Sequence, residues 1–353
     1  MGWSKGRIQL ENGQIVEAQT PVIISASRST DIPAFYADWF FDRLKKGYSA
    51  WTNPFNGVKG YISYEKTRFI VFWSKNPERL LPHLDYLKER NINCYLQYTL
   101  NDYDDEHLEK NVPKVEERIA TFKAMVAKMG RGRVIWRFDP LILTDTIDID
   151  LLLKKIEGIA KELVGYTDKL VFSFADILAY RKVKANLESS HINYRDWTPE
   201  DMEKFAARLE EMNKRWGFTT ATCGEKIDLE KYHIAHNRCV DDDLMIQIAW
   251  NDPILMEFLG VDIRKREFGL FDEDTVPDGA ILLADDHYAL KKKNNKDKGQ
   301  RQFCGCIISK DIGEYNTCPH LCEYCYANSS KEAAIRNWQM HKNNPFTDTI
   351  TGR

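Results

Sequence analysis

An alternation of short apolar runs and amphipathic helices, which begins at Pro21, limits the fold of this 353-residue chain more than any other feature. The runs are rich in β-branched and aromatic residues and end in polar residues; they read "VIISAS", "SAWTN", "FIVFWSKN", "CYLQYTLN", "VIWRFDP", "LVFSFAD" and "TTATCGE". Helix patterns with apolar residues at steps of three and four are clearest at 77–90, 113–129, 149–163 and 199–216. Strands that alternate with helices predict a parallel sheet that is buried on both faces.

The length of this alternation favours a closed barrel over an open sheet. Seven units fall within residues 21–225, and barrels of the (β/α)8 type need about 250 residues for eight units. The run "CIIS" at 306–309 is the candidate for the eighth strand. We therefore predict an α/β fold with a TIM-like (β/α) barrel. Its divisions are an N-terminal β-hairpin at 1–20, barrel units at 21–225, an insertion or subdomain at 226–303, and a strand, loop and helix at 304–345 that complete the barrel.

Composition limits the compartment and the partners. The net charge is only −3, which argues against broad, sequence-independent binding of nucleic acid. No apolar run approaches the roughly 18 residues that a membrane helix needs, and the first ten residues lack the apolar core of a secretory signal. A cytoplasmic protein without a membrane partner is expected. The basic run at 291–301 is more typical of a solvated loop than of a nucleic-acid contact, since Asn and Gly interrupt it and it contains no aromatic residue.

Polar side chains follow most of the predicted strands. In a barrel they would gather at the carboxyl ends of the strands and line one polar mouth. The alternative for each one is a solvated loop residue or a helix cap. The set is Arg28, Asp31, Lys75, Gln97, Arg137, Asp139, Asp176 and Glu225. Within it we expect Arg137, Asp139, Lys75 and Glu225 to contact a cofactor or substrate, and Arg28 and Asp176 to bind cofactor.

Three closely spaced cysteines near the C-terminus indicate metal chemistry. Cys318, Cys322 and Cys325, the cysteine triad, have the spacing Cys-x3-Cys-x2-Cys in "CPHLCEYCYAN". In a reducing cytosol such a group indicates a metal or redox site more than a disulfide. Four thiolates close a zinc site or saturate a four-iron cluster, whereas three leave one metal position open. Zinc is the alternative, but His320 is too constrained within the loop to be an obvious fourth ligand.

With the aromatic Tyr324 before its last cysteine, the triad resembles the Cys-x3-Cys-x-aromatic-Cys signature of the radical S-adenosylmethionine superfamily. The resemblance implies that the triad binds three irons of a [4Fe-4S] cluster and that the fourth iron chelates S-adenosylmethionine. It further implies one-electron cleavage of the sulfonium to methionine and a 5′-deoxyadenosyl radical, which abstracts hydrogen from a substrate. A flavodoxin or ferredoxin would be the electron donor, and Tyr324 would lie near the adenine.

The position of the triad departs from that superfamily, whose members normally carry it after the first barrel strand. A circular permutation that moves one unit to the end would explain the difference, with the cluster-binding unit last. Segments such as "SASRSTDIPAFY", "FWSKNP", "RFDP" and "DIGEYNTCPHLCEYCYAN" resemble an uncharacterised bacterial family of unknown function that has a C-terminal cysteine cluster. A weaker likeness, through the cluster loop and barrel alone, is to spore photoproduct lyase, which repairs DNA.

Five further cysteines lie outside the triad. Cys94 falls in an apolar run and is expected to be an ordinary buried side chain. The others, Cys223, Cys239, Cys304 and Cys306, form the cysteine quartet, and four thiols are the number that closes a second [4Fe-4S] cluster or a zinc site. The alternative is four reduced thiols. For the whole chain, the leading hypothesis is a radical S-adenosylmethionine enzyme, and the second is a metal-stabilised nucleic-acid-binding or repair module.

Overall fold

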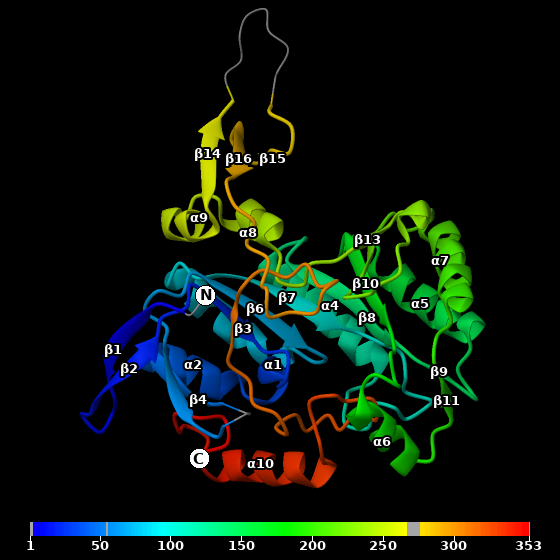
Figure 1. Ribbon diagram of the computed structural model, residues 1–353, viewed down its shortest axis with the longest axis horizontal. Helices are drawn as coiled ribbons and strands as arrows, with labels where there is room; N and C mark the ends of the chain where they lie inside the picture. The colour runs from blue at the N-terminus through cyan, green and yellow to red at the C-terminus, as the bar shows by residue number, and fades with distance from the viewer. Residues whose placement is uncertain (1–2, 54–55, 267–275, 353) are drawn as a thin grey trace, which may run out of the picture.

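The computed structural model describes residues 3–53, 56–266 and 276–352. Within them the largest sheet has eight strands, all parallel, in the order β13-β12-β10-β8-β7-β6-β3-β17 (Figure 1). In chain order the strands are β3 (Ile23–Ala26), β6 (Phe69–Ser74), β7 (Asn93–Thr99), β8 (Val134–Leu141), β10 (Lys169–Phe174), β12 (Thr219–Thr222), β13 (Ile234–His236) and β17 (Lys310–Asp311).

The prediction of a closed, circularly permuted barrel is wrong. Among the described residues β13 and β17 are the two outer strands of the sheet and do not pair with each other. They are three and two residues long, so the outer strands offer little backbone for pairing. The expected eighth strand at 306–309 is not a strand; β17 begins at Lys310 instead and pairs in parallel with β3.

The second predicted strand, "SAWTN", also lies elsewhere. It forms β4 (Tyr48–Thr52), which pairs with β5 (Lys59–Ser63) in an antiparallel arrangement. These two strands extend the N-terminal hairpin of β1 (Lys5–Gln9) and β2 (Ile15–Gln19) into a separate four-stranded sheet. Because β4 belongs to this smaller sheet, the main sheet consists of six inner strands and the two short outer strands β13 and β17.

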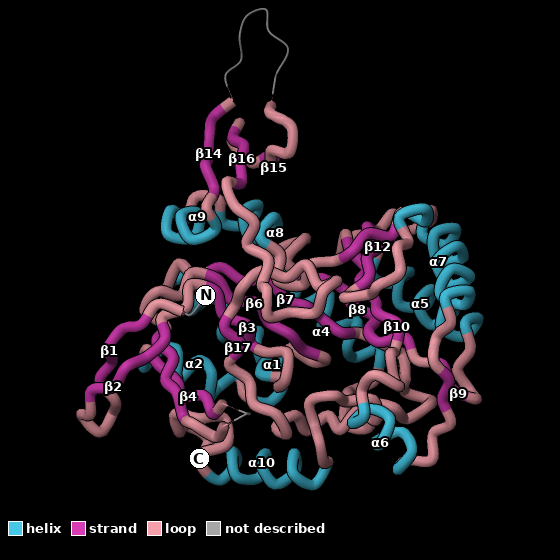
Figure 2. Tube along the Cα trace, in the orientation of Figure 1, coloured by secondary structure: helices cyan, strands magenta, loops and turns pink. Residues whose placement is uncertain are grey.

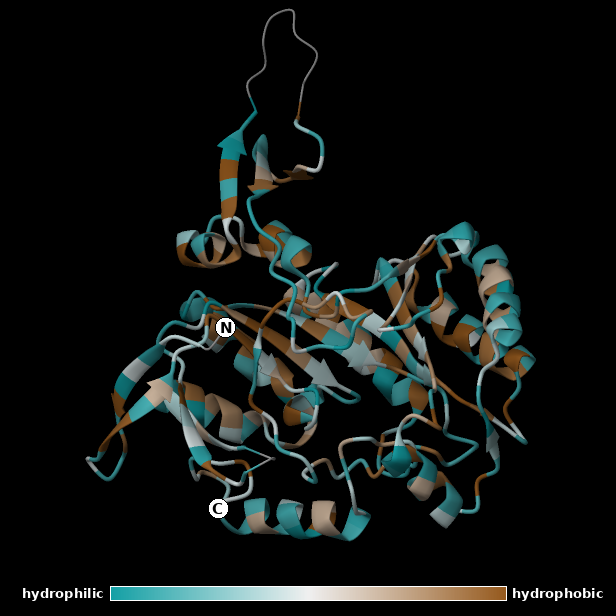
Figure 3. Ribbon diagram, viewed as in Figure 1, coloured by the Kyte–Doolittle hydropathy of each residue, from teal (hydrophilic) through white to brown (hydrophobic). Residues whose placement is uncertain are grey.

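Helices cover the sheet because each strand buries side chains on both faces. Along β6, Ile70 and Phe72 belong to one apolar cluster while Phe69 and Val71 belong to another. Alternate residues of a strand point to opposite faces, so these are the two sides of the sheet. The interior strands contain apolar runs, and the outer helices carry hydrophobic and hydrophilic residues in alternation (Figure 3).

Two of the long helices begin at residues whose side chains cap them. Thr198 caps α7 through its side chain, with Pro199 as the first helical residue, and Asp148 caps α5. The described helices are α1 (Ile32–Phe35), α2 (Ala37–Lys46), η1 (Glu78–His83), α3 (Leu84–Glu89), α4 (Val115–Met129), α5 (Ile149–Leu163), α6 (Arg181–Ser189), α7 (Pro199–Asn213), η2 (Glu230–Tyr232), α8 (Asp242–Ala249), α9 (Pro253–Leu259) and α10 (Lys331–Asn343). None of them is long and apolar enough to cross a membrane.

Two features interrupt the strand-and-helix order. Residues 226–303 carry β13, α8, α9 and a small antiparallel sheet of β14 (Val261–Lys265), β16 (His287–Lys291) and β15 (Ile281–Leu282), which projects from the main sheet (Figure 1). A two-stranded ladder joins β9 (Leu143–Thr144) to β11 (Tyr194–Arg195). Between β17 and α10 the chain is a long loop that carries the cysteine triad (Figure 2).

Candidate metal and cofactor site

The triad loop is fixed to the carboxyl edge, which is the side of the sheet at which the parallel strands end. The Thr317 hydroxyl lies 2.6 Å from that of Thr30, and the Tyr36 hydroxyl donates to the Thr317 carbonyl at 2.5 Å. Across the sheet, the Asn111 side chain donates to the Pro319 carbonyl at 2.9 Å. The loop therefore contacts segments that follow β3 and β7, although it lies more than 200 residues away in sequence.

His320 supports the loop through both ring nitrogens. One ring nitrogen lies 2.9 Å from Asp31 Oδ2 and the other lies 3.1 Å from the Asn111 carbonyl. Asp31 also accepts from the Ser74 hydroxyl at 2.7 Å and the Lys75 amide at 2.8 Å. Both ring nitrogens are thus engaged, and the histidine joins the loop to the ends of β3 and β6.

Of the three thiols of the triad, Cys322 is buried and the other two are partly exposed, and the charges of Cys318 and Cys325 act on Cys322. Burial raises the pKa of all three, and the charge of Lys75 opposes that rise at Cys322 and Cys325. The amide of Asn328 donates to Cys325 Sγ at 3.4 Å, and its side chain donates to the Cys318 carbonyl at 2.8 Å. Buried thiolates require a compensating cation, so this donor set suits a bound metal.

Beneath the loop lies a buried ion network centred on Glu109. Its carboxylate is 2.7 Å from Lys75 Nζ and 3.4 Å from Arg118 Nη1, and it accepts hydrogen bonds from Tyr324 and Asn101. Burial alone raises the pKa of Glu109, but the charges of Lys75 and Arg118 outweigh it and lower the pKa to about 2. Glu109 is therefore ionised, and it binds both Tyr324 and Lys75, whose charge acts on Cys322 and Cys325.

Two tyrosines beside the last cysteine differ in exposure. Tyr324 is 8% exposed, and its hydroxyl also accepts from Lys75 Nζ at 2.9 Å. Tyr326 is 45% exposed, donates to the Arg28 carbonyl at 2.7 Å and lies 6.3 Å from the Tyr180 ring, measured between centroids. The ring that is open to a ligand is thus that of Tyr326, which the sequence did not single out.

Arg28 interacts with residues near both cysteine groups. The charges of Cys239 and Cys306 of the quartet and of Tyr326 act on it. The guanidinium carbon lies 5.4 Å from the centroid of Trp73, and its Nη2 has no hydrogen-bond partner among the described residues. Burial alone lowers the pKa of Arg28, but Asp311 and the other negative groups around it together raise it. A buried, incompletely bonded guanidinium of this kind suits an anionic ligand group.

Arg137 and Asp139, both within β8, form a second polar group with Ser173 of β10. Arg137 pairs with Asp139, which also accepts from Ser173, and it donates to Gln97 at 3.2 Å. A further Arg137 hydrogen bond reaches Cys239 Sγ at 2.9 Å. Of the residues predicted to contact cofactor or substrate, Arg137 is thus buried against the quartet, while Asp139 is partly exposed.

The family comparison covers this whole arrangement. A family model described as "Domain of unknown function (DUF1848)" matches residues 23–327. The chain belongs to the DUF1848 family. The matched region begins at the first residue of β3 and ends two residues after Cys325, so it includes both cysteine groups. A search of curated proteins found no match.

The remaining predicted residues of this DUF1848 protein contact neither cysteine group through a hydrogen bond among the described residues. Asp176 is exposed and accepts from the Ala179 amide at 3.3 Å, as a turn-capping residue does. Glu225 accepts from the Phe174 amide at 3.0 Å, and burial is the main cause that raises its pKa to about 7. Cys94 is buried in β7, where burial raises its pKa to about 12.

The lysines of the basic run at 291–301 are largely engaged within the DUF1848 protein. Lys291 pairs with Asp242 at 3.0 Å and Lys292 pairs with Asp262 at 2.6 Å. Lys293 donates to the Phe258 carbonyl, Lys296 donates to the Gln302 carbonyl, and Arg301 donates to the Tyr180 hydroxyl. These contacts do not favour the nucleic-acid-binding alternative.

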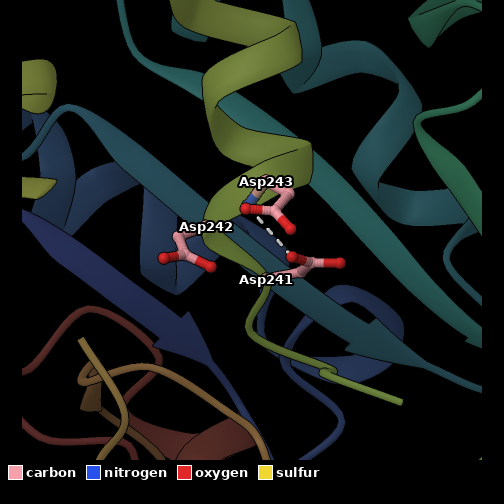
Figure 4. A group of neighbouring side chains, drawn as sticks. All are labelled: Asp241, Asp242 and Asp243. Carbon is pink, nitrogen blue, oxygen red and sulfur yellow. Dashed lines mark hydrogen bonds between the residues drawn. The ribbon is translucent and has the colours of Figure 1, made fainter. Parts of the chain in front are cut away.

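An acidic group at the start of α8 resembles a metal site but is already neutralised. One ligand oxygen from each of Asp241, Asp242 and Asp243 lies within 4.8 Å of the others (Figure 4). Arg238 and Lys291 both pair with Asp242 and Asp243, and Asp241 caps the helix by accepting from the Asp243 amide at 3.0 Å. The group is therefore explained as a helix cap with two cationic partners.

Proposed function

We propose that this protein is a radical S-adenosylmethionine enzyme whose [4Fe-4S] cluster is held by Cys318, Cys322 and Cys325. The supporting observation is the attachment of a three-thiol loop to the carboxyl edge, together with the half-buried Lys75, whose charge acts on two of the thiols. When bound, such a cluster supplies the electron that cleaves the sulfonium of S-adenosylmethionine. A three-thiolate set leaves one metal position for that ligand.

The residues under the loop would hold it in a fixed geometry. Lys75 offsets part of the negative charge that three thiolates bring into a buried region, and Glu109 fixes the position of Lys75. Tyr324 and Asn101 complete the network through hydrogen bonds to Glu109. We assign these four side chains positioning roles.

Contacts to the cofactor's polar groups would come from residues at the exposed part of the carboxyl edge. Arg28, with its unbonded Nη2, suits the carboxylate of the methionine moiety, and Asp139 suits its ammonium group or a ribose hydroxyl. Tyr326 suits an adenine ring, because its own ring is exposed next to Tyr180. Tyr324, buried by its network, would support the loop from below.

The test is the formation of 5′-deoxyadenosine. Protein reconstituted anaerobically with iron and sulfide is incubated with dithionite and S-adenosylmethionine, and products are separated by liquid chromatography. We expect wild type and the control Cys94→Ala to form 5′-deoxyadenosine and Cys322→Ala to form none, because two thiolates cannot hold a cubane with one open iron. Equal product from Cys322→Ala and wild type, or a colourless wild-type protein that binds only zinc, would exclude this function.

A further inference from the structure

The cysteine quartet comes from segments at opposite ends of the main sheet. Cys223 directly follows β12 and Cys239 follows β13, the two strands at one end of the sheet. Cys304 and Cys306 precede β17, the strand at the other end. The segment at 296–307 crosses between them, and the Ile307 amide donates to the Val240 carbonyl at 3.0 Å. Two ends of one sheet are thus joined at these four thiols.

The four sulfurs form a continuous series of contacts. Cys223 Sγ lies 3.3 Å from Cys239 Sγ, which also contacts the thiol of Cys306, and Cys306 in turn contacts the thiol of Cys304. None of them is in a disulfide. Cys239 and Cys306 are each 2% exposed, and Cys304 is 8% exposed. Four neighbouring thiols, three of them buried, supply the donor set of a four-thiolate metal centre.

Hydrogen-bond donors are directed at these sulfurs. Cys239 Sγ accepts from Arg137 at 2.9 Å and from the Asn237 side chain at 3.1 Å, and Cys306 Sγ accepts from the Val240 amide at 3.3 Å. A neutral thiol is a weak acceptor, whereas a thiolate is a strong one that an arginine stabilises. Donors of this kind tune and stabilise metal-bound thiolates, so their arrangement favours ligated sulfur over free thiol.

The backbone between Cys304 and Cys306 is adapted to bring both thiols to one place. A Cβ atom on Gly305 would lie 2.7 Å from Cγ of Arg238, so the position accepts no side chain without a shift of that arginine. Arg238 is itself held by Asp242 at 2.7 Å. Glycine is therefore required where the Cys-Gly-Cys segment packs against the segment that carries Cys239.

From these contacts the geometry points to a second metal centre at Cys223, Cys239, Cys304 and Cys306, ligated by four thiolates and separate from the triad. Its occupant is a [4Fe-4S] cluster or a zinc ion, which share this ligand set. Held there, the metal fastens the two ends of the sheet to each other beside Arg28 and Arg137. The centre does not depend on the function proposed for the triad.

The test is metal analysis of a full-length variant that lacks the triad. Cys318→Ala, Cys322→Ala and Cys325→Ala are combined, the protein is purified anaerobically, and its iron, sulfide and zinc contents are measured. We expect about four irons with sulfide, or about one zinc, per chain. Adding Cys239→Ser and Cys306→Ser should remove that metal, and adding Cys94→Ala, a buried thiol outside both groups, should leave it unchanged.

Two results would overturn the second centre. One is a folded triad-free variant, checked by circular dichroism and gel filtration, that contains neither metal and gives no thiolate-to-metal absorption on titration with cobalt(II). The other is metal that persists when Cys239 and Cys306 are both serine. Failure of the triad proposal looks different, because wild type and the triad-free variant would then contain the same amount of metal.

Discussion

Replacement of Glu109 by glutamine tests whether the buried network supports the triad loop. The carboxylate is 1% exposed and is paired with Lys75 and with Arg118, whose side chain is 0% exposed. An amide would leave Lys75 without a carboxylate partner and Arg118 with Asp104 alone. Loss of one partner of a buried ion pair costs about 3–5 kcal/mol. The fall in the pKa of Glu109 from 4.5 to about 2 corresponds to about 3 kcal/mol, at about 1.4 kcal/mol per pKa unit. This value agrees with the cost expected for the broken ion pair.

The assay is urea unfolding at neutral pH, with the free energy taken by linear extrapolation. The matched control is Glu162→Gln, the same chemical change in an exposed pair with Lys123, which should cost at most about 1 kcal/mol. Combining Glu109→Gln with Lys75→Met should recover part of the lost unfolding free energy, because it removes the lysine charge that Glu109→Gln leaves without a carboxylate partner. If Glu109→Gln unfolds at the same urea concentration as Glu162→Gln, the network does not stabilise the protein.

Three further outcomes follow from the same contacts. The pKa of Glu109 is depressed, so its contribution to the free energy of unfolding is present above the unfolded pKa of 4.5 and is lost as the pH falls towards about 2. The difference in unfolding free energy between wild type and Glu109→Gln should therefore narrow over that range. A difference that does not change with pH would contradict this. Tyr324→Phe should lower the unfolding free energy by about 1–3 kcal/mol, because it leaves buried hydrogen-bond partners unbonded. Tyr326→Phe, at an exposed ring, should lower it by under about 1 kcal/mol. Equal losses of the two variants in urea unfolding would refute the assigned difference in burial. Gly305→Ala should reduce the amount of metal that the triad-free variant retains. The control Gly158→Ala, whose added Cβ meets nothing within 4 Å, should not reduce it. If metal analysis finds the same metal content in both variants as in the triad-free parent, the packing argument at Gly305 is wrong.

The strands of the main sheet were largely predictable because they are buried on both faces. Runs such as that of β6, with Phe69, Ile70, Val71 and Phe72 all fully buried, leave a continuous apolar signal. The run of β4 has a similar composition but pairs with β5 in the smaller sheet. Composition does not show which strand another strand pairs with. The barrel prediction failed because it placed β4 in the main sheet. Closure also depends on the outer strands, whose lengths are set by long-range pairing with β12 and β3.

The candidate site was predictable where a local pattern exists and not elsewhere. The spacing of the triad can be read directly, and a count of the remaining thiols grouped the quartet that the structure brings together. Glu109 lies among several acidic residues in the loop after β7, and nothing in that loop distinguishes it before its partner Lys75 is seen, 34 residues away. Arg137 was assigned to a cofactor or substrate from its place at a strand end, but the sulfur of Cys239, 102 residues away, is one of its partners.

The most direct test of the central claim is the yield of methionine and 5′-deoxyadenosine from S-adenosylmethionine under strictly anaerobic, single-turnover conditions. Reductive cleavage at a triad-bound cluster predicts the two products in equal amounts, only when dithionite is present, and none from the Cys318→Ala, Cys322→Ala, Cys325→Ala variant even if that variant retains metal at the quartet. Neither product from a wild-type protein loaded with about four irons at the triad, or the same yield from the variant, would contradict the account.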